Sequence, residues 1–204
     1  MTKEDILNQY YNIRHLNTPK RIGCMMEMIR NLRPLTKEEW KYWYLKNVHD
    51  EKYLLALAEE MYQSIPESDR KTFQITYQVC LSYIYDVMFR RTFEGNEKEK
   101  QALRILQKAL SPDIQEAPID WDTNYFIDFY LKDSNDVLVG IQLKPESFFI
   151  GEYQKKVDID GKMEAFRQMY SARTYVLIYR KSSDGNGIDF VNPQVIDEIK
   201  KSLQ

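Results

Sequence analysis

The 204-residue sequence has two cysteines, seven glycines and no long apolar run. Cys24 and Cys80 form no CxxC pair and have no histidines at metal-ligand spacing, which argues against a disulfide framework and a structural zinc site. No segment predicts a signal peptide or a membrane span, so we expect a protein of the reducing cytoplasm without a membrane partner. A phosphate-binding loop and a GxGxxG motif are also missing, so no nucleotide cofactor is expected.

The chain also lacks an excess of one charge. Its 29 basic and 31 acidic residues leave a formal net charge of −2, so any site for a polyanion must be local. An apolar content of 43% over this length is sufficient for a hydrophobic core together with a helical subdomain.

The first half of the sequence predicts helices. Thr36 and Glu39 have the spacing of a capping box, in which hydroxyl and carboxylate satisfy free backbone donors at a helix start, and a helix to about Val48 follows. Apolar residues at spacings of three and four predict a second helix over 51–64, which Pro66 ends.

The same spacing predicts one long helix over 68–91, a break at Gly95, and another helix that ends at Leu110. In this last helix Glu99 shares its face with apolar residues, namely Ala102, Leu103, Leu106 and Leu110. Glu99 either points inward as a functional acid, or sits in the first turn, where it favours the helix dipole and reaches water.

Beyond Pro118 the period changes to that of strands. We expect strands over 124–132 and 137–144, a helix over 153–171, a buried strand over 173–180, and a short strand and a helix after it. The prediction is an α+β protein, with a mixed sheet flanked by helices and an N-terminal helical subdomain.

Three polar residues lie within the first two of these strands. Asp128, Gln142 and Lys144 can project from one side of a hairpin if directly paired residues have numbers of equal parity. That condition selects a loop of three or five residues near 132–136, whereas a loop of four would separate the side chains.

An acid, an amide and an amine at one place are typical of a divalent metal site. Mg²⁺ prefers oxygen ligands and often uses only one or two carboxylates. The Asp128 carboxylate, the Gln142 side-chain oxygen and the Leu143 backbone carbonyl are candidate metal ligands, and Lys144 is placed to orient a water and offset negative charge. This is the chemistry of phosphodiester hydrolysis; the alternative is a solvated hairpin face.

A helix with Glu99, a strand with Asp128, and a strand with Gln142-x-Lys144 followed by a helix and a strand resemble the PD-(D/E)XK nuclease superfamily. The resemblance covers roughly residues 92–180. The segments TFEGNEKE and VGIQLKPESFF, with LTKEEWKYWYLKN upstream, are similar to type II restriction endonucleases of the MjaI type. This resemblance implies metal coordination by Asp128 and Gln142, catalysis by Lys144 and a supporting role for Glu99; Gln142 replaces the commoner acid.

The resemblance further implies a Mg²⁺-dependent endonuclease that cleaves double-stranded DNA at a short palindrome, with CTAG as the implied target. A homodimer matches the two-fold symmetry of such a site, and a restriction role requires a DNA methyltransferase in the host. The implied organisation is a helical subdomain over 1–91, for dimerisation or DNA recognition, and a catalytic core over 92–204. Two alternatives remain: a nuclease acting on branched or repair DNA, and a non-catalytic helical interaction protein.

Basic residues outside the hairpin are candidates for phosphate contacts, although for any single one of them a solvated end of a helix or strand is the commoner case. They are Arg90, Arg91, Lys155, Lys156, Arg167, Arg180 and Lys181.

Overall fold

The computed structural model describes residues 1–149, 153–185 and 187–203, with side chains for all of them except 149 and 153–158. The chain divides into two compact units, 1–96 and 97–204. Within the described residues, no helix is both long enough and apolar enough to cross a bilayer.

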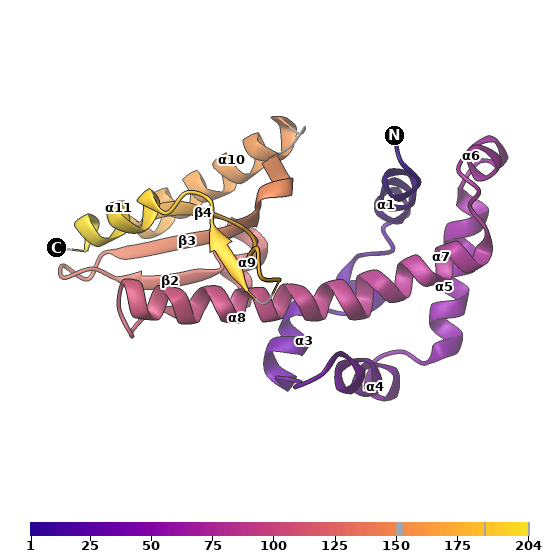
Figure 1. Cartoon of the computed structure of the whole chain (residues 1–204), viewed down its shortest axis with the longest axis horizontal. Helices are drawn as coiled ribbons and strands as arrows, with labels where there is room; N and C mark the ends of the chain where they lie inside the picture. Colours follow the sequence, from indigo (N-terminus) through magenta and orange to yellow (C-terminus); the bar gives the residue numbers. More distant parts are fainter. Residues whose placement is uncertain (150–152, 186, 204) are drawn as a thin grey trace. The chain divides into compact units, whose positions relative to one another are not determined.

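The first unit is helical (Figure 1). Its elements are α1 (Lys3–Ile13), α2 (Pro19–Ile22), α3 (Met25–Leu32), α4 (Lys37–Asn47), α5 (Glu51–Ser64), α6 (Glu67–Thr72), α7 (Tyr77–Tyr85), the π-helical turn η1 (Asp86–Arg91) and the start of α8 (Thr92–Ala109). Two fully buried aromatic residues of α4 anchor its core. The Trp40 indole donates to the Met88 carbonyl at 3.0 Å, and the Tyr44 hydroxyl donates to the Ile22 carbonyl at 3.0 Å. The polar atom of each of these two side chains therefore has a partner, as burial requires.

The expected helices over 36–48 and 51–64 are confirmed by α4 and α5. At the start of α4, Thr36 accepts from the Glu39 N–H at 3.1 Å, while the Glu39 carboxylate accepts from the Leu35 N–H at 2.8 Å. The Glu39 carboxylate therefore bonds one residue before the N-cap, rather than to Thr36 as in a standard capping box.

The prediction of one helix over 68–91 is wrong. Gln74 has a φ of +52°, which ends the helical path after α6, and the Thr76 hydroxyl then accepts from the Val79 N–H at 3.3 Å to begin α7. The Thr76 cap allows a new helix to begin instead of one continuous helix. The spacing of apolar residues contains no information about this cap. The last part of the segment is η1, where the helix widens.

The predicted break at Gly95 is also wrong, because α8 runs through it. A Cβ placed on Gly95 would meet no atom within 4 Å. Glycine costs a helix interior only about 1 kcal/mol relative to alanine, which the rest of an 18-residue helix outweighs.

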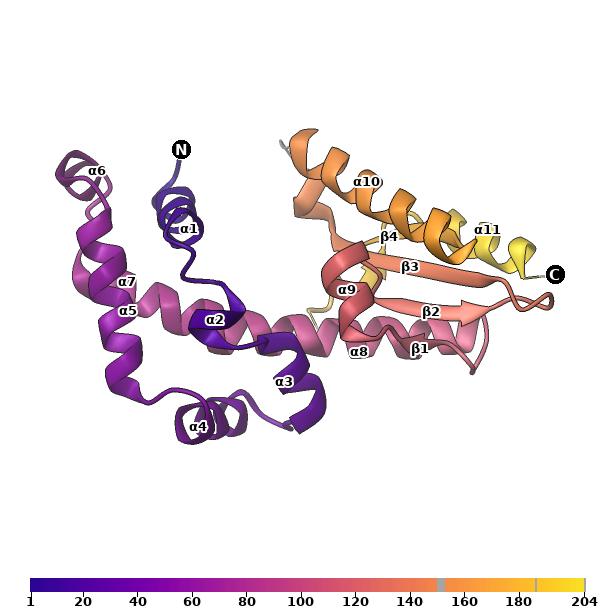
Figure 2. The same ribbon diagram turned by 180° about the vertical axis from the view of Figure 1, so that it is seen from behind.

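The second unit contains a five-stranded sheet (Figure 2). Its elements are β1 (Gln115–Glu116), α9 (Ile119–Tyr125), β2 (Phe129–Lys132), β3 (Leu138–Pro145), a 3₁₀ turn (Glu146–Phe149), α10 (Tyr153–Tyr170), β4 (Arg173–Lys181), β5 (Ile188–Phe190) and α11 (Gln194–Ser202). The strand order is β1-β2-β3-β4-β5; β3 and β4 are parallel, and the other pairs are antiparallel. This mixed sheet with flanking helices confirms the expected fold class.

Both faces of the sheet are covered. One hydrophobic cluster joins alternate residues of β3 to α8 and α11, and a second joins the opposite face to α9 and α10. Because β3 is central and buried on both sides, any polar side chain on it has to be accommodated within the protein.

The expected strand over 124–132 is too long at its start. Residues up to Tyr125 form α9, and Phe126, with a φ of +58°, ends that helix. Asp128 therefore lies immediately before β2 rather than within it. With seven residues and an acidic first turn, α9 is too short to establish a helical period, which explains why periodicity does not reveal it.

Gly140 of β3 allows the helical layer to approach the sheet closely. A Cβ at this position would lie 3.0 Å from the Ile127 Cδ1 atom and 3.2 Å from the Phe166 Cε1 atom, and both neighbours are fully buried. We expect Gly140→Ala to lower the free energy of unfolding by about 1–2 kcal/mol through overpacking.

Thermal unfolding measures this effect, and Gly161→Ala is the matched control. A Cβ at Gly161 in α10 would meet no atom within 4 Å. The control should gain about 0.5–1 kcal/mol because alanine stiffens the unfolded chain and favours the helix. Equal stabilisation by the two substitutions would show that the β3 contact is not tight.

Candidate active site

The register of the β2–β3 hairpin determines which side chains meet. Phe129 pairs with Ile141 and Lys132 with Leu138, so paired residues have equal parity and the loop is the five residues 133–137. The expected parity is confirmed. It brings Asp128 and Gln142 to the same side, at the same end of the hairpin.

Asp133 fixes this loop. Its carboxylate accepts from the N–H groups of Asn135, at 2.8 Å, and Val137, at 2.9 Å, and Asp136 adopts a φ of +64°. An aspartate that bonds backbone groups two and four residues ahead defines a compact turn, so the loop length follows from local chemistry.

Asp128 is held at the hairpin end by both backbone and side chain. Its N–H donates to the Ile141 carbonyl at 2.9 Å, and its Oδ2 atom accepts from the Leu143 N–H at 2.6 Å and from the Gln142 Nε2 atom. Only 5% of the residue is exposed. The carboxylate is therefore pre-positioned by two donors of one neighbouring strand.

Gln142 brings its side-chain amide to the same point, with the Nε2 atom facing Asp128. It is 1% exposed, and its Oε1 atom has no hydrogen-bond partner within the described residues. An acceptor left unpaired in a protein interior costs about 1–3 kcal/mol, which points to a ligand-binding role for that atom.

The surrounding acids are too few to hold a metal ion by themselves. Across residues 1–149, 153–185 and 187–203, no three histidine, cysteine, aspartate or glutamate side chains gather closely enough to do so. The candidate oxygen ligands are instead of three kinds: the Asp128 carboxylate, the Gln142 side-chain amide and the Leu143 backbone carbonyl. The Gln142 Nε2 atom donates a hydrogen bond to this carbonyl at 3.3 Å. Such a set suits a cation that keeps several waters, as Mg²⁺ does.

The local field is negative. Burial, together with the charges of Glu99 and Asp122, raises the pKa of Asp128 to about 8, and Lys144 opposes this shift. Glu99 is half-buried in the middle of α8, which rules out the interpretation that places it in a first turn. Burial, with the charges of Glu99 and Asp128, also raises the pKa of Tyr179 to about 12. A carboxyl in this environment gains from any cation that replaces its proton.

Lys144 lies among aromatic rings. Its Nζ atom is 5.3 Å from the ring centroids of both Phe126 and Phe148. A second ammonium shares this surface, because Lys162 of α10 lies 4.1 Å from the Phe126 centroid and donates to the Thr123 carbonyl at 3.1 Å. No sequence motif marks Lys162; the packing of α10 beside α9 places it here.

Several basic residues that are candidates for phosphate contacts already contact acids. Arg90 and Arg91 both donate to Asp86, the latter at 2.7 Å, and Arg167 donates to Glu164 at 2.8 Å. Of the remaining candidates for phosphate contacts, Arg180 and Lys181 are exposed. The side chains of Lys155 and Lys156 lie outside the described residues.

The raised pKa of Asp128 predicts a pH-dependent stability in the absence of metal. The folded protein retains a proton that the unfolded chain loses above about pH 4, so this contribution to stability decreases as pH rises toward 8. Asp128→Asn removes this titration. Its melting temperature relative to wild type should therefore rise by roughly 10 °C between pH 5 and pH 9, since about three pH units at about 1.4 kcal/mol each give about 4 kcal/mol, and 1 kcal/mol corresponds to about 2–4 °C.

Calorimetry in EDTA tests this difference, with Asp120→Asn, an exposed aspartate of α9, as the control. The control should follow wild type at every pH. A constant difference between Asp128→Asn and wild type across the pH range would contradict the proposed titration.

The chain matches the family model described as MjaI restriction endonuclease over residues 4–201. Neither the curated proteins nor the solved structures gave a match. The match covers both compact units, including the hairpin with Asp128 and Gln142. The chain therefore belongs to the MjaI restriction endonuclease family and is a type II restriction endonuclease.

Proposed function

We propose that the hairpin end around Asp128 is the active site, and that the protein hydrolyses phosphodiester bonds of double-stranded DNA with Mg²⁺. The observation that carries this proposal is a buried carboxylate of raised pKa beside a buried glutamine whose Oε1 atom has no partner within the described residues. Each of these features is unfavourable in an empty protein, and a bound cation would offset both.

The residues at the hairpin end fit such an ion. Asp128, the Leu143 carbonyl and Gln142 would hold it, with the Gln142 amide turned so that Oε1 replaces Nε2 beside Asp128, and the Glu99 carboxylate would add negative charge. When bound, the ion would act as a Lewis acid and lower the pKa of a coordinated water. Gln142 carries no charge where an acid is commoner, so we expect the affinity for Mg²⁺ to be weaker than that of a two-carboxylate site.

The lysines supply positive charge on the substrate side. Lys144 would orient the attacking water and stabilise the charge that develops on the phosphorus oxygens. Lys162, beside the same Phe126 ring, would hold an adjacent phosphate of the cleaved strand.

The target and assembly follow from the same proposal. A short palindrome calls for two copies of the active site, so we propose a homodimer, with CTAG as the target implied by the family resemblance. A methyltransferase in the host would protect the same sequence.

The central test is cleavage of a long duplex of known sequence. Wild type with Mg²⁺ should give discrete fragments, EDTA should abolish them, and Asp128→Ala or Lys144→Ala should reduce the rate by at least about 100-fold. Lys132→Ala, at the far end of the same hairpin, should retain full activity because Lys132 is exposed and pairs only with the loop residue Asp136. Undiminished cleavage by Asp128→Ala would place the active site elsewhere.

Lys162 is tested by DNA binding rather than by cleavage alone. In the Asp128→Ala background, Lys162→Ala should weaken duplex binding about tenfold and reduce the slope of log K against log salt by about one. Lys162→Arg should retain most of the affinity because it keeps the charge. An unchanged salt slope would show that Lys162 is a structural residue bonded to Thr123.

A further inference from the structure

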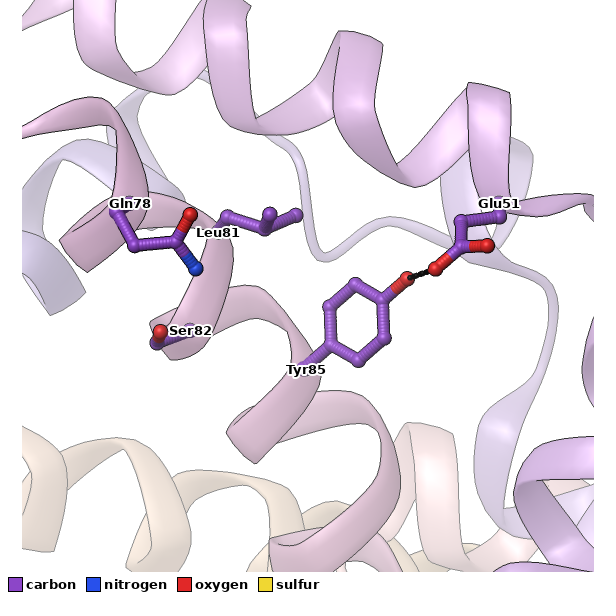
Figure 3. Close-up of a pocket in the computed structure, with 5 residues that line it drawn as sticks. All are labelled: Glu51, Gln78, Leu81, Ser82 and Tyr85. Carbon is purple, nitrogen blue, oxygen red and sulfur yellow. Dashed lines mark hydrogen bonds between the residues drawn. The ribbon is translucent and has the colours of Figure 1, made fainter.

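The helical unit contains a hollow that the catalytic proposal does not use. It has a volume of about 410 Å³, and its lining comes from the start of α5 and one face of α7 (Figure 3). The lining residues are Glu51, Gln78, Leu81, Ser82 and Tyr85.

One wall of the hollow is already fixed. The Tyr85 hydroxyl donates to the Glu51 carboxylate at 2.9 Å, and the Lys41 ammonium lies 4.7 Å from the centroid of the Tyr85 ring. Burial and this hydrogen bond raise the pKa of Tyr85 to about 12, so the phenol remains a neutral donor. The Tyr85 hydroxyl and one oxygen of Glu51 are therefore already hydrogen-bonded to each other without a ligand.

The other wall has unused hydrogen-bonding groups. Gln78 and Ser82 are exposed one turn apart on α7, and neither side chain has a hydrogen-bond partner in the part of the chain that the structure describes. The opposite face of α7 is buried through Cys80 and Ile84, and Thr76 caps its start. The two free side chains therefore project from a helix whose position is fixed.

The negative charge of Glu51 makes the hollow better suited to a DNA base than to a phosphate group. The Glu51 carboxylate repels phosphates, whereas bases are neutral and carry donors and acceptors. A glutamine amide pairs in two places with adenine, through N6 and N7. A concave site can also enclose a base that is turned out of the duplex, whereas a base pair that stays stacked presents only its edge.

We propose that this hollow is a base-recognition site that receives an adenine of the target DNA, with Gln78 as the specificity-determining residue and Ser82 as a second contact. The inference rests on the proposed DNA-cleaving function and assigns base reading to the helical unit. Leu81 supplies the apolar contact for the ring, and Glu51 with Tyr85 excludes phosphate.

The experiment compares cleavage of duplex libraries by wild type, Gln78→Ala and Ser82→Phe, the last of which fills the hollow from an exposed position. Each variant should lower kcat/KM on the wild-type target about 10- to 100-fold, and Gln78→Ala should lose selectivity at one adenine. Gln63→Ala is the matched control, because Gln63 is exposed on α5 and bonds only to Glu59.

Replacing that adenine by purine, which lacks the N6 amino group, separates recognition from damage to the fold. Wild type should lose about tenfold in kcat/KM with the purine duplex, whereas Gln78→Ala should lose nothing further. Identical target preference in wild type, Gln78→Ala and Ser82→Phe would overturn the proposal. Failure of the proposed catalytic site would give a different result: Asp128→Ala would still cleave DNA, with the base preference of wild type.

Discussion

The buried carboxyl group of Asp128 is the constraint on which the second unit depends. A carboxyl group taken out of water requires hydrogen-bond partners, and here both come from the adjacent strand, as the Leu143 N–H and the Gln142 amide. Those donors are in place only when β2 and β3 pair in one register. The hairpin, the polar residues of β3 and the charge of Glu99 are therefore parts of one electrostatic arrangement.

The central position of β3 explains how polar groups occur within a core. Its odd-numbered residues pack toward α8 and α11, while Gly140 and Gln142 project toward the other side. Gly140 lets Ile127 and Phe166 close over the sheet. Close packing around one small residue excludes water from the neighbouring polar pair, which strengthens every charge interaction there.

Sequence reasoning predicts the hairpin well because parity is a discrete property. A strand has a period of two, so the side on which Asp128 and Gln142 meet follows from the length of the loop alone. It fails where local backbone chemistry outweighs apolar spacing, as at Gln74 and Thr76, and where a short helix such as α9 has little periodicity. Lys162 shows a further limit, because its place beside Lys144 arises from tertiary packing that no local pattern records.

The five-residue loop after β2 has a consequence for the history of the family. Asp133 shapes this loop by accepting hydrogen bonds from its backbone, and the length of the loop determines which face of β3 meets Asp128. Insertion or deletion of one residue would reverse that face and send Gln142 and Lys144 away from the acid, whereas a change of two would preserve it. We therefore expect members of the family to differ in the length of this loop by two residues rather than by one, although the loop lies at the other end of the hairpin from Asp128.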